Sequence, residues 1–315
     1  MSTLKQSRSA ALAVIASEDA DYERLGLARD VIAPWEDGAR TDNRRGTYEW
    51  WYFDARLDDG SSLVVTFMNK DLASPNDPLT PTIRIDLDLA DGRSIQKLAT
   101  YPPDSWRAST AGADVRIGEN RFSGDLHSYR IVATVEEIAI DVTLVGDVPP
   151  WRPQTGYLLY GAKRDMEFAW LPSVPLGAVT ATYRIGDEAH QTTGVGYHDH
   201  NWGNASLQKL VHDWYWARGQ AGPYSVIASI VTAHERYDYT ELPLFMLATL
   251  APRPQEARSD ELVSPCRRRV ARRRRDVARA LHRGHAWRAR QDPRPPPLAL
   301  AGSLTIAQDG ATGLP

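Results

Sequence analysis

The sequence has very little cysteine, and this scarcity removes several classes of protein from consideration. Cys266 is the only cysteine among 315 residues, which excludes an internal disulfide and any cysteine-rich zinc module. Glycine-rich phosphate loops are missing as well, as are a GxSxG elbow and a GxGxxG run after a strand. Nucleotide chemistry and serine hydrolysis therefore have no support in the sequence.

Long apolar runs are also lacking. The N-terminal stretch 10–16 is apolar, but it ends at the polar residues 17–19 and is too short for a signal peptide. No later stretch reaches the roughly 20 apolar residues that a membrane helix requires. We therefore expect a soluble, cytoplasmic protein without stable membrane insertion.

Arginine and proline crowd into the last part of the chain, residues 252–315. Residues 251–315 hold 14 arginines, no lysine and 6 acidic residues, and 8 of the 21 prolines, while tyrosine, phenylalanine and asparagine are absent from them. A GC-rich coding strand read in the wrong frame yields this composition, which favours a non-native end over a disordered tail. A basic arm for nucleic acid or an acidic partner ranks last, because no nucleic-acid module accompanies the arginines. We predict no nucleic-acid partner.

Alternating hydrophobicity recurs through the rest of the chain, apart from a helix expected over residues 17–31. Thr82–Leu89 places its isoleucines and leucines on one face, and residues 138–144 and 179–185 repeat this pattern. A period of two is typical of half-buried strands, and short glycine-containing turns such as Asp58-Asp59-Gly60 separate them. The pattern predicts an all-β fold of antiparallel sandwiches or barrels.

The segment 48–53 contains five aromatic residues among six. Alternation along a strand divides it into two faces: Tyr48, Trp50 and Tyr52 on one, and Glu49, Trp51 and Phe53 on the other. Both faces must then be covered by protein, and composition alone favours a core strand. The alternative is that one aromatic face lines a cavity, with Glu49 directed inward beside it.

The run GYHDHNWG, residues 196–203, is the strongest candidate for a centre of chemistry. If it is extended, alternation again gives two faces: His198, His200 and Trp202 on one, and Tyr197, Asp199 and Asn201 on the other.

Three interpretations of this run stay open. The two histidines are suited to a metal, with His212 or Asp213 as a third ligand, although no second ligand cluster is present. A carboxylic acid and an imidazole side by side are suited to proton transfer, and Asp199 and His200 would be that pair. The third interpretation is a tight turn between strands, fixed by its two glycines.

A further aromatic strand, His212–Gly219, follows this run, and Trp214 and Trp216 face together in it. A core strand is the default interpretation. Three aromatic strands near one polar cluster nevertheless favour a pocket for a greasy, flat or isoprenoid ligand.

The segments GTYEWWYFDARLDDG, GYHDHNWG and DWYWARG, in this order, resemble the carotenoid 1,2-hydratase, AttH-like and kievitone hydratase-like group. The resemblance covers roughly residues 46–250. It implies two tandem lipocalin-like (calycin) β-barrels, a ligand pocket near their junction and no cofactor. The domains would be an N-terminal segment 1–30, a first barrel 31–203, an incomplete second barrel 204–251 and the basic tail 252–315.

Family hydratases add water to an isoprenoid C=C bond, and their catalytic His-x-Trp element falls on His200 and Trp202. The resemblance thus implies hydration without a cofactor. Our hypothesis is acid–base catalysis without a metal, with Asp199 or His200 as proton donor. The indoles of Trp50, Trp202 and Trp214 would stabilise the carbocation. The candidate catalytic residues are His198, Asp199, His200 and Trp202, and the candidate substrate-binding residues are Glu49, Trp50, Tyr52, Tyr197, Asn201, Trp214 and Trp216.

Two other functions remain as alternatives. A related lipocalin-like group catalyses Diels–Alder cyclisation in natural-product pathways by shaping a polyene. A non-catalytic protein that binds lipid or isoprenoid ligands is the alternative from a different class. All three functions predict a hydrophobic small molecule as the partner, and the sequence does not predict an oligomeric state.

Overall fold

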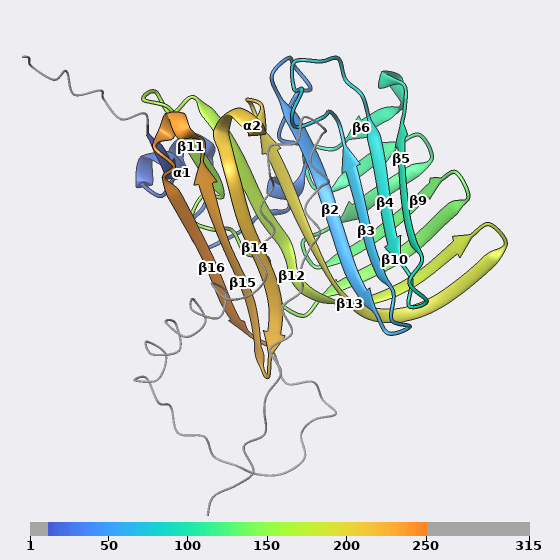
Figure 1. Ribbon diagram of the computed structural model, residues 1–315. Coiled ribbons are helices and arrows are strands. Elements are labelled where there is room, and N and C mark those ends of the chain that lie inside the picture. The colour runs from blue at the N-terminus through green and yellow to red at the C-terminus, as the bar shows by residue number, and fades with distance from the viewer. Residues whose placement is uncertain (1–11, 251–315) are drawn as a thin grey trace, which may run out of the picture.

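The computed structural model describes residues 12–250 and shows a protein built almost wholly of antiparallel strands (Figure 1). The predicted all-β class is therefore confirmed. The tail 252–315 and Cys266 lie outside the described residues, so what the sequence predicts for them stays a prediction. No helix among the described residues is long and apolar enough to cross a membrane.

The helical elements are short: α1 (Asp19–Leu25), η1 (Pro34–Asp37), η2 (Pro103–Ser105), α2 (Leu207–Leu210) and η3 (Glu235–Tyr237). The larger sheet consists of β1 (Ala13–Ile15), β2 (Tyr48–Leu57), β3 (Ser62–Met68), β4 (Thr82–Asp88), β5 (Ser94–Thr100), β6 (Trp106–Ala108), β7 (Asp114–Ile117), β8 (Asn120–Gly124), β9 (Ser128–Val135), β10 (Ile138–Gly146), β11 (Tyr157–Tyr160), β12 (Met166–Ile185) and β13 (Glu188–Gly203). The smaller sheet consists of β14 (Val211–Ala221), β15 (Tyr224–Ala233) and β16 (Glu241–Thr249). The predicted helix is shorter than expected, because Gly26 takes the left-handed φ of 68° and ends α1.

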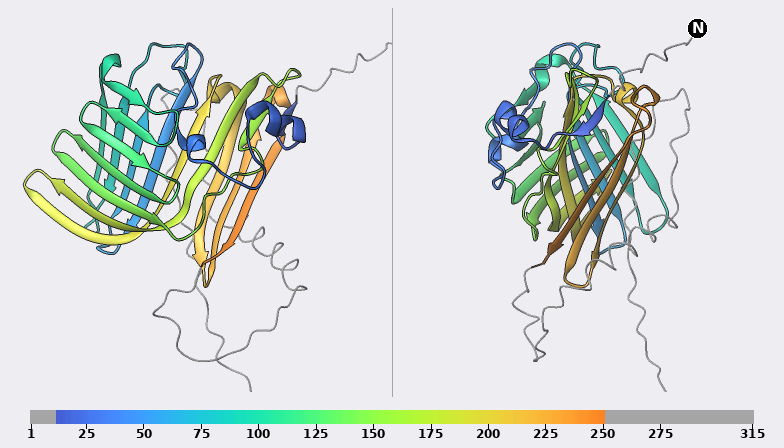
Figure 2. Two further views of the ribbon diagram at one scale, coloured as in Figure 1. Left: turned by 180° about the vertical axis from the view of Figure 1, so that it is seen from behind. Right: turned by 90° about the vertical axis from the view of Figure 1, so that its left-hand side faces the viewer.

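The larger sheet has 13 strands, paired in the order β5-β4-β3-β2-β13-β12-β10-β9-β8-β7-β6, with β11 on β12 and β1 on β11. It curls around an apolar core supplied by both of its halves (Figure 2). The curl brings β5 close to the turn between β9 and β10. There the Nζ of Lys97 on β5 lies 2.7 Å from Glu136 and 2.9 Å from Glu137.

The period-two prediction holds in β4, where Ile83, Ile85 and Leu87 are buried in this core. The aromatic segment lies in β2, between β3 and β13, and it is covered on both faces as predicted. GYHDHNWG is the last half of the 16-residue strand β13. The tight-turn interpretation of this run is therefore wrong, because all eight residues are extended.

The smaller sheet packs on the larger one with only one of its faces. Leu242, Leu244 and Met246 on β16 are buried there, whereas Phe245 and Leu247, which alternate with them, are exposed. β13 ends at Gly203, where the first barrel is predicted to end. The division into two tandem domains stays a prediction.

Candidate active site

β2 and β13 lie side by side at the centre of the larger sheet, and their register sets two polar clusters on its two faces. His200 is paired with Trp51, and Asp199 with Tyr52. Because consecutive residues of a strand point to opposite faces, the side chains of Asp199 and His200 are directed away from each other. The hypothesis that these two exchange a proton directly is therefore wrong.

The first group, the barrel cluster, is Asp37, Glu49, His198 and His200, inside the curled sheet. His198 Nδ1 lies 2.8 Å from the carbonyl oxygen of Tyr52, and its Nε2 lies 3.2 Å from Asp37 Oδ2. A carbonyl only accepts, so Nδ1 carries a proton. The contact between Nε2 and Asp37 then requires a second proton, which the two side chains share.

His200 is held in the same cluster by a different carboxylate. Its Nε2 lies 2.8 Å from Glu49 Oε1, and its ring stacks on Trp51 at 4.1 Å between centroids. Glu49 also accepts the backbone N–H groups of Arg40 at 2.5 Å and Thr41 at 3.1 Å. The cluster thus ties the loop before β2 to the middle of β13.

Two buried imidazoles lie against two buried carboxylates in this cluster. Burial alone would raise the pKa of Asp37, but His198, His200 and the hydroxyl of Tyr129 outweigh burial and hold that pKa below its ordinary value. Among residues 12–250, no three side chains of histidine, cysteine, aspartate or glutamate converge as a metal site requires. The metal interpretation with His212 or Asp213 as third ligand is wrong, since His212 contacts only Asp213 of that set, at 2.8 Å, on β14.

The second group, the inter-sheet cluster, lies where β13 faces the smaller sheet. Asp199 Oδ2 accepts hydrogen bonds from Trp170 Nε1 and from the hydroxyl of Tyr197, both at 2.7 Å. Asp199 Oδ1 accepts one from Asn201 at 2.7 Å. Burial raises the pKa of Asp199 above its ordinary value, although these donors oppose the rise.

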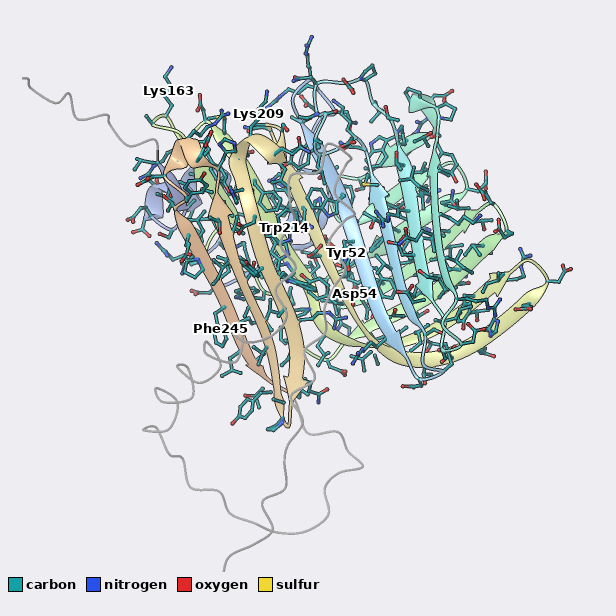
Figure 3. The ribbon with its side chains drawn as sticks, in the orientation of Figure 1. Tyr52, Asp54, Lys163, Lys209, Trp214 and Phe245 are labelled. Atoms are coloured by element: carbon teal, nitrogen blue, oxygen red, sulfur yellow. The ribbon has the colours of Figure 1, made fainter. Side chains whose placement is uncertain are left out.

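Arg218 on β14 completes the inter-sheet cluster from the other sheet. It forms a buried ion pair with Asp54, and Figure 3 shows Tyr52 and Asp54 on the side of β2 that faces β14. Burial lowers the pKa of Arg218 to about 10. Arg218 Nε and Trp216 Nε1 are both buried and lack a hydrogen-bond acceptor among the described residues.

The remaining predicted residues do not converge on one point. Trp202 belongs to the barrel face, 4.7 Å from the ring of His200, whereas Trp50 lies on the opposite face and stacks on Phe168. Trp214 is 36% exposed. The three indoles predicted to surround a carbocation are therefore separated, and that part of the hydration hypothesis is wrong.

Sequence reasoning missed four side chains of these clusters: Asp37, Tyr129, Trp170 and Arg218. Asp37 lies in η1 and Tyr129 on β9, both far from GYHDHNWG in the sequence, and no local pattern marks them. The sequence did contain a pattern that indicates Arg218, because this residue continues the alternation of Trp214 and Trp216 along β14. The catalytic and binding roles of the residues in both clusters stay predictions.

Comparison with known proteins places the chain in a family. Residues 43–249 match a protein-family model described as Diels-Alderase-like. The chain is 26% identical over 205 residues to the quinolone epoxide rearrangement protein of Emericella nidulans, covering 61% of this chain and 56% of that protein. It is 27% identical over 224 residues to a Diels-Alderase of Acremonium sp., covering 62% and 52%. The chain spans about half the length of these curated relatives.

A solved structure shares the fold. The crystal structure of an AttH-like protein from Nitrosomonas europaea superposes with a TM-score of 0.51 at 18% identity, over 70% of this chain and 72% of that one. At this identity the likeness concerns the fold alone. The lipocalin-like, all-β fold predicted from the sequence is confirmed by it.

Proposed function

Because this chain belongs to the Diels-Alderase-like family, we propose that it is an enzyme that cyclises a hydrophobic polyene by [4+2] cycloaddition, without a cofactor. The reaction takes place in the inter-sheet cluster. The observation that carries the proposal is the pair of buried N–H groups, Trp216 Nε1 and Arg218 Nε, that lack acceptors among residues 12–250 and lie in aromatic surroundings. The Diels–Alder alternative of the sequence thereby replaces hydration as the leading hypothesis.

A cycloaddition is a suitable reaction for a site lined mainly by aromatic side chains. It forms two C–C bonds and converts three C=C bonds into one, so no proton or electron enters or leaves. Catalysis then consists largely of holding diene and dienophile in contact, which supplies a high effective concentration. Tyr197 stands between Tyr52 and Trp216, with ring centroids at 6.3 and 5.2 Å, and these faces would hold a folded polyene.

The unpartnered N–H groups of Trp216 and Arg218 would activate the dienophile electrostatically. A dienophile C=C bond becomes more electron-poor when its conjugated carbonyl oxygen accepts hydrogen bonds. These bonds also stabilise the negative charge that grows on that oxygen in the transition state, and they are strongest in a dry site. Trp216 and Arg218 offer these bonds from β14, opposite the rings of β13. Since the rings of Tyr197 and Trp216 already pack together, a substrate would enter by parting the two sheets.

Replacing Trp216 by Phe tests the proposal, because the ring face is kept and the N–H is removed. With a linear polyene that carries an activated enone, we expect the cyclisation rate of Trp216→Phe to fall roughly 10- to 100-fold. Tyr215→Phe, at an exposed ring on the other face of the same strand, is the control, and its rate should equal that of the unaltered chain. Equal rates for both variants would contradict the role of the N–H group.

Hydration remains the second candidate, and one observation favours it. The raised pKa of Asp199 lets its carboxyl keep a proton at higher pH than an exposed aspartate does, as a proton donor to an alkene must. Mass spectrometry separates the functions on one panel of polyenes and prenylated aromatics. A cyclised product has the mass of its substrate, a hydrated product gains one water, and a binding protein returns the ligand unchanged.

A further inference from the structure

A polar cleft of about 200 Å³ opens where β2 begins and β13 ends. It is lined by Arg40, Thr41, Asp42, Arg44, Thr47, Glu167, Gly203 and Asn204. Gly203 lies four residues beyond Asp199 on β13, about 13 Å at the rise of a strand. The cleft is therefore separate from the inter-sheet cluster and from the function proposed for it.

Arg40 is a cation without a carboxylate partner among the described residues. Its guanidinium lies 4.4 Å from the ring of Trp35 and 5.9 Å from that of Trp202, so aromatic faces hold it in place. The neighbouring arginines are already paired: Arg152 with Glu36 at 2.5 Å, and Arg44 with Asp42 at 3.5 Å. Arg40 forms no ion pair with a carboxylate of residues 12–250, although it acts on Glu167 at longer range and interacts with the hydroxyl of Tyr157.

Glu167, on β12, brings the opposite charge to the same cleft. Its carboxylate is half-buried and accepts no hydrogen bond from residues 12–250, although Arg24, Arg44 and Arg40 act on it at longer range. The cleft lining is closely packed at Gly203, because a Cβ at this position would lie 2.5 Å from the hydroxyl of Tyr48. That hydroxyl is buried and also lacks a partner in the described part of the chain.

We propose that this cleft binds the zwitterionic head of an α-amino acid, with the ligand carboxylate on Arg40 and the ligand ammonium group on Glu167. Glu167 would repel a simple anion, and Arg40 and Arg44 would repel a simple cation. A zwitterion satisfies both unpaired groups through charge-assisted hydrogen bonds. The cleft is large enough for such a head group and part of its side chain.

Calorimetric titration of the full chain with three probes tests this assignment. L-phenylalanine carries both charges, N-acetyl-L-phenylalanine lacks the ammonium group, and L-phenylalaninamide lacks the carboxylate. We expect L-phenylalanine to bind at least about tenfold more tightly than either blocked probe. Equal affinity for all three, or no binding of L-phenylalanine at millimolar concentration, would overturn the proposal.

Glu167→Gln keeps the shape of the side chain and removes its charge. This variant should bind L-phenylalanine about tenfold more weakly and leave the affinity for N-acetyl-L-phenylalanine unchanged or improved. Glu241→Gln, on an exposed position of β16, is the matched control and should bind all probes as the unaltered chain does. Arg40→Met should lose the preference for L-phenylalanine over its amide. If both cleft variants keep the full preference, another site binds the amino acid.

Discussion

At the scale of single residues, Asp37 is the least replaceable side chain of the barrel cluster. It faces His198, His200 and Tyr129 and is fully buried. Removing one partner from a buried ionic network leaves the others unpaired, so Asp37→Asn should lower the free energy of unfolding by roughly 3–5 kcal/mol at neutral pH. Urea unfolding followed by tryptophan fluorescence measures this loss. Asp104→Asn, on the exposed helix η2, should change the free energy of unfolding by less than about 0.5 kcal/mol.

The pH dependence of this loss of stability follows from the direction in which folding shifts the pKa of Asp37. The pKa of Asp37 is lower in the folded chain than its unfolded value of about 3.9. The charged carboxylate therefore contributes stability that is fully present above the unfolded pKa and lost as pH falls through the folded pKa. The difference between the unaltered chain and Asp37→Asn should be present at about pH 5 and shrink as pH falls below about pH 4. A difference that grows on acidification would contradict this assignment.

The same residues show what the sequence could and could not predict at this scale. Because side chains alternate along a strand, the sequence alone places three side chains on one face: His198, His200 and Trp202. The contacts in the structure agree with this placement. The partner of His198 does not follow, because Asp37 lies 161 residues earlier and reaches it only through the curl of the sheet. Local spacing specifies directions of side chains, whereas partners depend on the tertiary fold.

At the scale of elements, the close pairing of β13 with β2 depends on glycine. A Cβ on Gly194 would lie 2.2 Å from the backbone oxygen of Arg56 and 2.9 Å from the Cα of Leu57. Neither atom can move without shifting β2, so Gly194→Ala should lower the free energy of unfolding by about 1–3 kcal/mol. Gly146→Ala, at the end of β10, meets nothing closer than 3.5 Å and should change it by less than about 0.5 kcal/mol. Thermal unfolding of the two variants side by side measures the difference.

Strand existence was predictable at this scale, but strand length and pairing were not. Alternation in Thr82–Leu89 yields β4 almost to the residue. The run GYHDHNWG shows the limit, because its glycines and its aspartate favour a turn locally, and only pairing with β2 and β12 on either side keeps it extended. Tertiary contacts override the local preference there.

At the scale of the whole molecule, the smaller sheet has one apolar face that residues 12–250 leave uncovered. Tyr215, Ile230, Phe245 and Leu247 are exposed on β14, β15 and β16, and the labelled Phe245 lies on the open side of this sheet (Figure 3). Contiguous apolar surface of this kind promotes association in water. This sheet has three strands among residues 12–250, and the incomplete second barrel stays a prediction.

Leu247→Lys tests whether this face drives self-association. Leu247 is 52% exposed, so a lysine fits there without loss of core packing, and its charge should oppose contact between two such faces. We expect sedimentation velocity over a range of concentrations to show less association for Leu247→Lys than for the unaltered chain. Leu98→Lys adds the same charge at a leucine that is 58% exposed on β5, and association should be unaffected by it. If both lysines reduce association equally, net charge and not the uncovered sheet controls it.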